Sequence, residues 1–132
     1  MALLGFVGVG VGAMLGAWLR WWLGIALNSQ LPTLQLGTLA ANLIGGYLIG
    51  LALGSVENFQ SLAPETRLFI TTGFLGGLTT FSTFSAETTA LLLRAEYLSA
   101  ALGIGAHVIG SLVMTLLGVG TVLLVRGWMG SH

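Results

Sequence analysis

Apolar runs long enough to cross a lipid bilayer fill almost the whole chain, and this limits its possible folds more than any other feature. A spanning helix needs about 20 mostly apolar residues, and four such runs cover residues 3–27, 35–55, 65–97 and 99–128. Only 6% of the residues are charged, whereas a soluble domain carries roughly 25%. The sequence therefore predicts an all-α protein of four transmembrane helices. It forms a single multi-pass transmembrane domain (1–132), with lipid as its solvent, in the cell inner membrane.

The few charged residues argue against several classes of function. Four Arg balance four Glu, and Lys and Cys are absent, so we expect no basic nucleic-acid face, no disulfide and no thiolate metal site. Arg67 and Arg126 fall on one side of the predicted bundle, and Arg94 and the span-end Arg20 fall on the other. The excess of Lys and Arg on one side sets the orientation of a membrane protein, and here the Arg residues are divided almost equally. We therefore expect insertion in both orientations, that is, dual topology.

Glycine recurs at helical spacing along the predicted spans. The stripes comprise Gly8, Gly12, Gly16 and Gly24 in the first span, and Gly46, Gly50 and Gly54 in the second. Small residues four apart let helix backbones approach closely in lipid. These stripes predict a tightly packed bundle that assembles into an oligomer.

Polar residues within the spans form two lines. Thr38 and Asn42 lie four residues apart in the second span, and His107, Ser111 and Thr115 follow the same spacing in the fourth. Each line therefore occupies one helix face. Such groups are costly at membrane depth and usually face a bundle interior or an aqueous path. The two lines fit either of two roles, interhelical hydrogen bonding or the lining of a polar path, and their positions alone do not decide between them.

The third run (65–97) favours a polar path over interhelical hydrogen bonding alone, because it contains a helix-breaking segment. Gly76 and Gly77 are adjacent, and residues 79–85 are all Thr, Ser or Phe, which are middling to poor helix formers. We therefore expect the third span to be broken near 77–85, in mid-membrane. Freed carbonyls at such a break can hold a cation, and the next helix N-terminus favours an anion. Glu87 is expected in the first turn of that second half.

Hydrogen-bond donors around this break suit a small anion. Phe81 and Phe84 add ring edges, which carry partial positive charge, and Arg20 could concentrate anions in a vestibule. The donor side chains are Asn42, Ser82, Thr83, Ser85, Ser111 and Thr115.

Three motifs carry a family resemblance. Residues 73–84 (GFLGGLTTFSTF) followed by Glu87, residues 12–20 (GAMLGAWLR) and residues 37–45 (GTLAANLIG) resemble the Fluc (CrcB) fluoride ion channels over essentially the whole chain. The resemblance implies a passive channel that exports fluoride and so reduces fluoride toxicity. It also implies an antiparallel homodimer with a structural sodium ion at the dimer centre.

The resemblance also implies roles for particular residues. Phe81 and Phe84 would form aromatic anion sites, and the backbone carbonyls of Gly76 and Thr79 would coordinate sodium. The role of His107 stays open. The rest of the implied anion pathway consists of Asn42, Ser82, Thr83, Ser111, Thr115, Thr38, Glu87 and the vestibule residue Arg20.

Two other functions fit the sequence less well. A small proton-coupled multidrug exporter needs a titratable carboxylate buried in mid-span. The first span has none, and Glu87 is the only carboxylate near a membrane centre. A non-transporting membrane scaffold would need only the glycine stripes. An enzyme is not expected, because no nucleophile, base and orienting group occur together.

Overall fold

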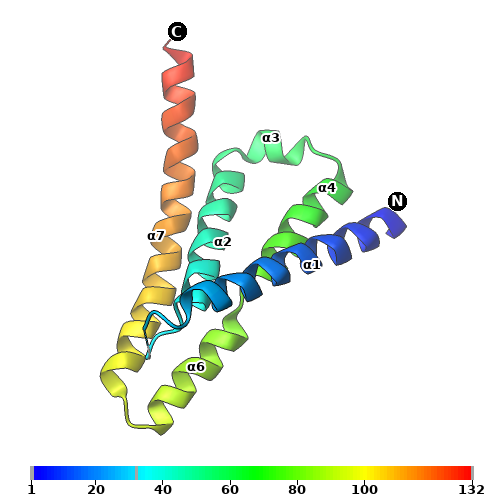
Figure 1. Cartoon of the computed structure of the whole chain (residues 1–132). Coiled ribbons are helices and arrows are strands. Elements are labelled where there is room, and N and C mark those ends of the chain that lie inside the picture. Colours follow the sequence, from blue (N-terminus) through cyan, green and yellow to red (C-terminus); the bar gives the residue numbers. More distant parts are fainter. Residues whose placement is uncertain (1, 32, 132) are drawn as a thin grey trace.

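The computed structural model describes residues 2–31 and 33–131, so that Met1, Pro32 and His132 lie outside the described residues. The described chain is built from helices (Figure 1). They are α1 (Ala2–Leu27), α2 (Leu36–Gly54), α3 (Val56–Gln60), α4 (Pro64–Leu68), the π-helix η1 (Phe69–Leu75), α5 (Gly76–Leu78), α6 (Phe81–Leu93) and α7 (Tyr97–Gly130).

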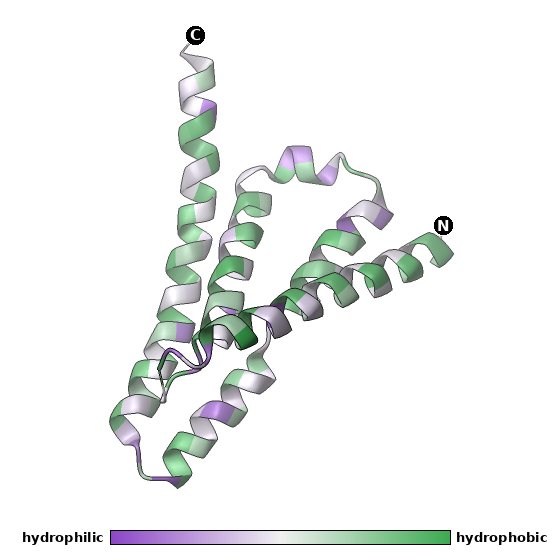
Figure 2. Cartoon of the chain, in the orientation of Figure 1, coloured by the Kyte–Doolittle hydropathy of each residue, from purple (hydrophilic) through white to green (hydrophobic). Residues whose placement is uncertain are grey.

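Three of these helices, α1, α2 and α7, are long and apolar enough to cross a membrane, judged by length and composition among the described residues. Figure 2 shows hydrophilic residues gathered at α3, at the start of α4 and in the loops, whereas the three long helices are mainly apolar. Over residues 2–31 and 33–131 the protein is thus all-helical, with three candidate membrane-spanning helices.

The run 65–97 is not one continuous helix. Helical chain covers α4, η1 and α5, stops at Thr79 and Thr80, and resumes as α6. A turn then follows, in which Ala95 adopts a φ of 60°. The last helix begins at Tyr97 rather than at residue 99, so Tyr97 belongs to α7 and not to the third run.

The π-helix η1 was not expected from the sequence. Its backbone bonds skip one residue more than those of an α-helix, and such segments occur frequently at functional sites. The hydroxyl of Thr71 donates to the carbonyl oxygen of Arg67 at 2.8 Å, so a side chain already competes for the backbone acceptors at this point. Gly73 and Gly77, four residues apart, both face α1.

Glycine lies at the crossing of α1 with η1 on both sides (Figure 1). A Cβ on Gly12 would lie 2.8 Å from the backbone nitrogen of Phe74, and one on Gly16 would overlap the Phe74 carbonyl oxygen. From the other side, a Cβ on Gly73 would lie 2.9 Å from the carbonyl oxygen of Val9. The predicted close packing through the first glycine stripe is therefore confirmed.

Helices α2 and α7 run side by side in the same manner (Figure 1). A Cβ on Gly50 would overlap the carbonyl oxygen of Thr115. One on Gly118 would overlap the Tyr47 carbonyl oxygen and lie 2.8 Å from the nitrogen of Leu51. Backbone contact here allows a hydroxyl on α7 to reach the backbone of α2, as described below.

The buried core is small and adjoins the interruption. Leu78, the last residue of α5, is fully buried and packs with Leu23 of α1 and Ala41 of α2. The chain is thus fixed immediately before Thr79, and the interruption starts from an anchored point.

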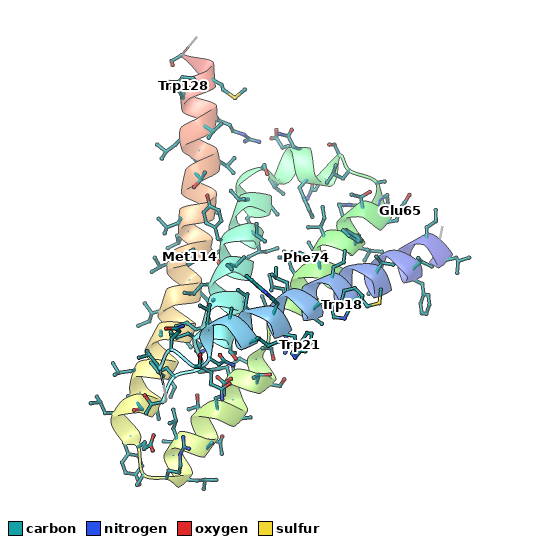
Figure 3. All side chains as sticks on the ribbon, in the orientation of Figure 1. Trp18, Trp21, Glu65, Phe74, Met114 and Trp128 are labelled. Carbon is teal, nitrogen blue, oxygen red and sulfur yellow. The ribbon has the colours of Figure 1, made fainter. Side chains whose placement is uncertain are left out.

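Most other apolar side chains are exposed. Trp18 and Trp21 project from α1, and Trp128 lies at the far end of α7 beyond the rest of the molecule (Figure 3). Soluble monomers rarely expose contiguous apolar surface on this scale. The exterior therefore suits lipid or another apolar partner better than water.

Candidate functional site

Two extended residues separate α5 from α6. Thr79 has φ −87° and ψ 152°, and Thr80 has φ −153° and ψ 121°. The Thr80 hydroxyl accepts a hydrogen bond from the backbone N–H of Thr83 at 3.1 Å, so Thr80 is the N-cap of α6. Such a cap stabilises a helix start by about 1 kcal/mol. The non-helical stretch is therefore shorter than the expected 77–85.

The side-chain amide of Asn42 holds this interruption. Its Oδ1 accepts from the N–H of Thr80 at 2.8 Å, and its Nδ2 donates to the carbonyl oxygen of Thr80 at 3.0 Å. Buried backbone groups need such partners when a helix stops. Asn42 thus replaces the helical bond that the Thr80 N–H would make to Gly76, and it gives the Thr80 carbonyl a donor besides the first bond of α6.

The interruption also deprives the last four carbonyl oxygens before it of their helical donors, those of Gly76 and Thr79 among them. In a continuous helix the carbonyl of Gly76 would accept from the N–H of Thr80, which bonds to Asn42 instead. The carbonyl of Thr79 would accept from the N–H of Thr83, which bonds to the Thr80 hydroxyl. Backbone carbonyls are hard oxygen ligands, so the residues present fit a small alkali or alkaline-earth cation.

A cavity of about 480 Å³ lies beside the interruption. Helices α2, η1, α5, α6 and α7 all contribute to its wall. Of the sequence-predicted residues it brings together Asn42, Gly76, Thr79, Phe81, Phe84 and Ser111, and it adds His107, Thr71 and Thr80. Phe81, which lies at the edge of the cavity, is 76% exposed. The cavity therefore opens to the surface of the single chain.

Three rings lie against one another along one wall of this cavity. The centroids of Phe81 and Phe84 lie 5.5 Å apart in an edge-to-face arrangement with 71° between the planes. Phe84 is buried, and one of its faces stacks on His107 at 4.5 Å with 29° between the planes. With one face covered, the rim of Phe84 is the part best placed to meet a ligand, and a ring rim attracts negative charge.

A second pocket, of about 440 Å³, lies around Arg20 on α1. It brings Arg20 together with Thr38 and Thr83, two further predicted residues. The Arg20 guanidinium is held in place, since its Nε donates to the carbonyl oxygen of Gly77 at 3.2 Å. A half-buried cation at the mouth of a pocket raises the local concentration of anions.

A small pocket of about 20 Å³ adjoins both larger ones. It holds Glu87, and it shares Phe84 and His107 with the main cavity and Gln35 with the Arg20 pocket. The Thr38 hydroxyl donates to Oε1 of Glu87 at 2.7 Å. The three pockets thus share lining residues, in the order Arg20 pocket, Glu87 pocket, main cavity.

Three predicted donors are not brought into these pockets. Ser82 and Ser85 are exposed on α6, and Ser82 Oγ lies 3.2 Å from the Thr80 hydroxyl. The Thr115 hydroxyl donates to the carbonyl oxygens of Gly46 and Ser111 at 3.1 and 2.9 Å, so it serves helix packing here. Glu87 was expected in the first turn of the second half-helix, and this was wrong: α6 starts at Phe81 and has no acidic residue in its first turn.

Sequence reasoning missed two hydroxyl residues of the site, Thr71 and Thr80, and left a third residue undecided. Thr80 was not selected, although Thr is a preferred N-cap and its place before the run 81–93 was a usable signal. His107 was left open, and the structure places it against Asn42, with His107 Nδ1 3.0 Å from Asn42 Nδ2. No local pattern predicts that contact, because 65 residues separate the partners.

Comparison with known proteins points to one family. The sequence profile described as CrcB-like protein, Camphor Resistance (CrcB), matches residues 7–119. A protein of Nitrosospira multiformis is 58% identical over 132 residues, the whole of both chains. One of Ralstonia pickettii is 57% identical over 122 residues, which is 92% of this chain and 97% of the relative. One of Cupriavidus metallidurans is 55% identical over 119 residues, 90% and 94% of the two chains.

All three relatives are named fluoride-specific ion channel FluC. Because the profile covers most of the chain and the relatives are more than half identical along nearly their full length, the resemblance found in the sequence motifs is confirmed, and the chain belongs to the CrcB-like family.

Proposed function

We propose that this protein is a passive, fluoride-selective ion channel of the cell inner membrane, which exports fluoride and so limits its toxicity. The observation that carries the proposal is the full-length similarity to proteins named as fluoride channels. That similarity includes the segment in which the helix stops beside a cavity lined by hydroxyls and phenylalanine rings.

The chemistry of the site supports transport of a small anion without an enzymatic step. Conduction needs binding that is favourable enough for the ion to enter and weak enough for it to leave. Ring edges and neutral hydroxyls meet this requirement, since they attract an anion without a full opposite charge. The cation Arg20 lines its own pocket and not the main cavity beside the interruption.

The proposed path runs through the three adjoining pockets. An anion would enter at Arg20 with Thr38 and Thr83, pass Glu87, and reach the main cavity with Phe81 and Phe84. Ser111 would offer a hydroxyl in that cavity, whereas the exposed Ser82 and the backbone-bound Thr115 would contribute only after a rotamer change.

We further propose that the working unit is an antiparallel homodimer in which the third, interrupted run crosses the membrane. Support comes from the main cavity, which opens to the surface where Phe81 is exposed. An aqueous path cannot open sideways into lipid, so a second copy of the chain is the simplest cover. The near-equal distribution of Arg between the two sides supports copies in opposite orientations.

A sodium ion at the centre of this dimer is the last part of the proposal. The carbonyls of Gly76 and Thr79 would hold it, because both have lost their helical donors. Two copies of this pair would supply four oxygens around one ion. The ion would fix the two interruptions against each other. We expect the thermal stability of the dimer to fall when sodium is replaced by a large organic cation.

A liposome experiment tests the central proposal. The purified full-length protein is reconstituted into vesicles loaded with potassium fluoride, without a pH gradient, and valinomycin is added to carry the counter-ion. A fluoride electrode should then record rapid efflux, and a chloride electrode on matched vesicles should record only the leak of empty liposomes. Fluoride efflux no faster than that of empty liposomes would refute the channel.

A further inference from the structure

We infer that His107 is a positioning residue of the pathway: as a neutral ring protonated on Nε2, it accepts a hydrogen bond from Asn42 and thereby holds Asn42 on the interrupted helix. The inference rests on the proposed function, because Asn42 fixes the segment that carries the proposed ion path. It starts from the hydrogen bonds that meet at the Asn42 amide.

The backbone of Thr80 determines which way this amide faces. A backbone N–H can only donate, so the atom 2.8 Å from the Thr80 nitrogen is the oxygen of Asn42. The other terminal atom is then the NH₂ group, which faces the Thr80 carbonyl at 3.0 Å. Both contacts agree on the same orientation, and the reversed amide would make neither bond.

The orientation of Asn42 in turn determines the state of His107. The NH₂ group of Asn42 lies 3.0 Å from Nδ1 of His107 and can only donate. Nδ1 must therefore accept, and it carries no proton. A doubly protonated ring would set N–H against N–H, so the ring is neutral and its proton resides on Nε2.

The surroundings of His107 support a fixed ring. It is 9% exposed, and it stacks on Phe84 with 4.5 Å between centroids. It also lines both the main cavity and the small pocket of Glu87. The stack on Phe84 fixes the plane of the ring, and a 180° flip within that plane would replace Nδ1 by a C–H that cannot accept, so the Asn42 bond selects the orientation of the ring.

The bond to His107 completes the hydrogen bonding of Asn42. One hydrogen of the NH₂ group serves the Thr80 carbonyl and the other serves His107. Without an acceptor at position 107, a part-buried N–H would lose its partner, and such groups are costly to leave unmatched. Asn42 would then turn toward other acceptors and release Thr80.

The first test needs no variant in the pathway. His132 is replaced by Gln, so that His107 is the only histidine of the chain, and the ring is labelled with ¹⁵N in protein reconstituted in liposomes at neutral pH. Solid-state NMR should find Nε2 protonated and Nδ1 bare. A proton on Nδ1, in a neutral or a charged ring, would overturn the inference.

The second test separates the acceptor from the ring. His107→Asn places an oxygen close to the position of Nδ1 but removes the stack on Phe84, whereas His107→Phe keeps a ring and removes the acceptor. Fluoride efflux should fall at least about fivefold in His107→Phe and be largely retained in His107→Asn. Wild-type efflux in His107→Phe, or equal losses in both variants, would overturn the role of the acceptor.

The two proposals fail in different ways. If the unaltered protein carries no fluoride, the proposed function fails, and the NMR result still reports the contact between His107 and Asn42. If the unaltered protein carries fluoride and His107→Phe carries it equally well, the channel stands and the positioning role fails. Elution of each variant as wild type in size-exclusion chromatography ensures that folded protein is compared.

Discussion

The side chain of Asn42 pairs with both backbone polar groups of Thr80, accepting from its N–H at 2.8 Å and donating to its carbonyl at 3.0 Å. This pairing joins α2 to the point where the third run stops being helical. It gives the Thr80 N–H the acceptor that Gly76 would have supplied in a continuous helix. The interruption is thus a specified feature of the fold with its own partner residue.

Removing this pairing should destabilise the protein. In Asn42→Ala the part-buried Thr80 N–H loses its partner, and the Thr80 carbonyl keeps only the first bond of α6; an unmatched buried group costs about 1–3 kcal/mol and a lost hydrogen bond about 1 kcal/mol. We expect the free energy of unfolding to fall by about 2–4 kcal/mol and fluoride efflux to fall with it. Thermal unfolding in detergent, followed by tryptophan fluorescence, measures the first effect.

A matched control for this prediction is Asn58→Ala, since Asn58 is exposed on α3. It should unfold at the wild-type temperature. If Asn42→Ala and Asn58→Ala unfold together, the pairing between Asn42 and Thr80 does not hold the interruption.

The glycine stripes lead to a second prediction, on packing. Gly12→Ala places a Cβ 2.8 Å from the Phe74 nitrogen, and only backbone surrounds it, so the helices must separate. Overpacking of this kind costs about 1–3 kcal/mol. Gly10→Ala, two residues away on the same helix, meets nothing within 4 Å and should be neutral or slightly stabilising. Equal melting temperatures for the two variants would contradict the backbone contact between α1 and η1.

The long helices were predictable because lipid imposes a simple rule on them. About 20 apolar residues are needed to cross a bilayer, and the structure has continuous helices at Ala2–Leu27, Leu36–Gly54 and Tyr97–Gly130. Glycine spacing similarly indicated the crossing at Gly12, because a helix period and a small side chain suffice to predict close packing.

The interior of the site was less predictable, for physical reasons. The interruption itself follows from poor helix formers after a pair of glycines, but its length depends on the Thr80 cap and on Asn42, a tertiary partner 38 residues away. The π-helix at Phe69–Leu75 has no compositional signature. Glu87 was misplaced by one turn because helix ends are set by caps, which composition locates only approximately.

Replacement of the paired rings should stop conduction and leave the fold intact. Phe81→Ile and Phe84→Ile keep apolar bulk but lose the positive ring edge that an anion can meet. We expect fluoride efflux from liposomes to fall to that of empty vesicles in each variant. Phe6→Ile on the exposed face of α1 is the control and should conduct as wild type. Full efflux through Phe81→Ile and Phe84→Ile would remove the aromatic rings from the ion path.

Glu87 distinguishes a passive channel from a proton-coupled exporter. Its Oε1 accepts from the Thr38 hydroxyl, and the amide oxygen of Gln can accept the same bond. A passive channel with Glu87→Gln should therefore keep fluoride efflux within about threefold of wild type, with or without a pH gradient. A carrier would lose transport, because it exchanges protons through a buried carboxylate. Efflux that vanishes in Glu87→Gln, together with a wild-type rate that follows the pH gradient, would favour the carrier.

Dual topology is testable with a single thiol, because the chain has no cysteine of its own. Asn58 is exposed on α3 between two long helical segments, so in Asn58→Cys the thiol reports which side of the membrane this loop occupies. With little bias between the loops, about half of the protein should react with a membrane-impermeant reagent added to intact cells. Adding Ser61→Lys and Leu62→Lys beside it should move the loop to the cytoplasmic side and abolish labelling from outside. Complete labelling or complete protection of the Asn58→Cys protein would establish a single orientation, and the antiparallel arrangement of two copies would then be excluded.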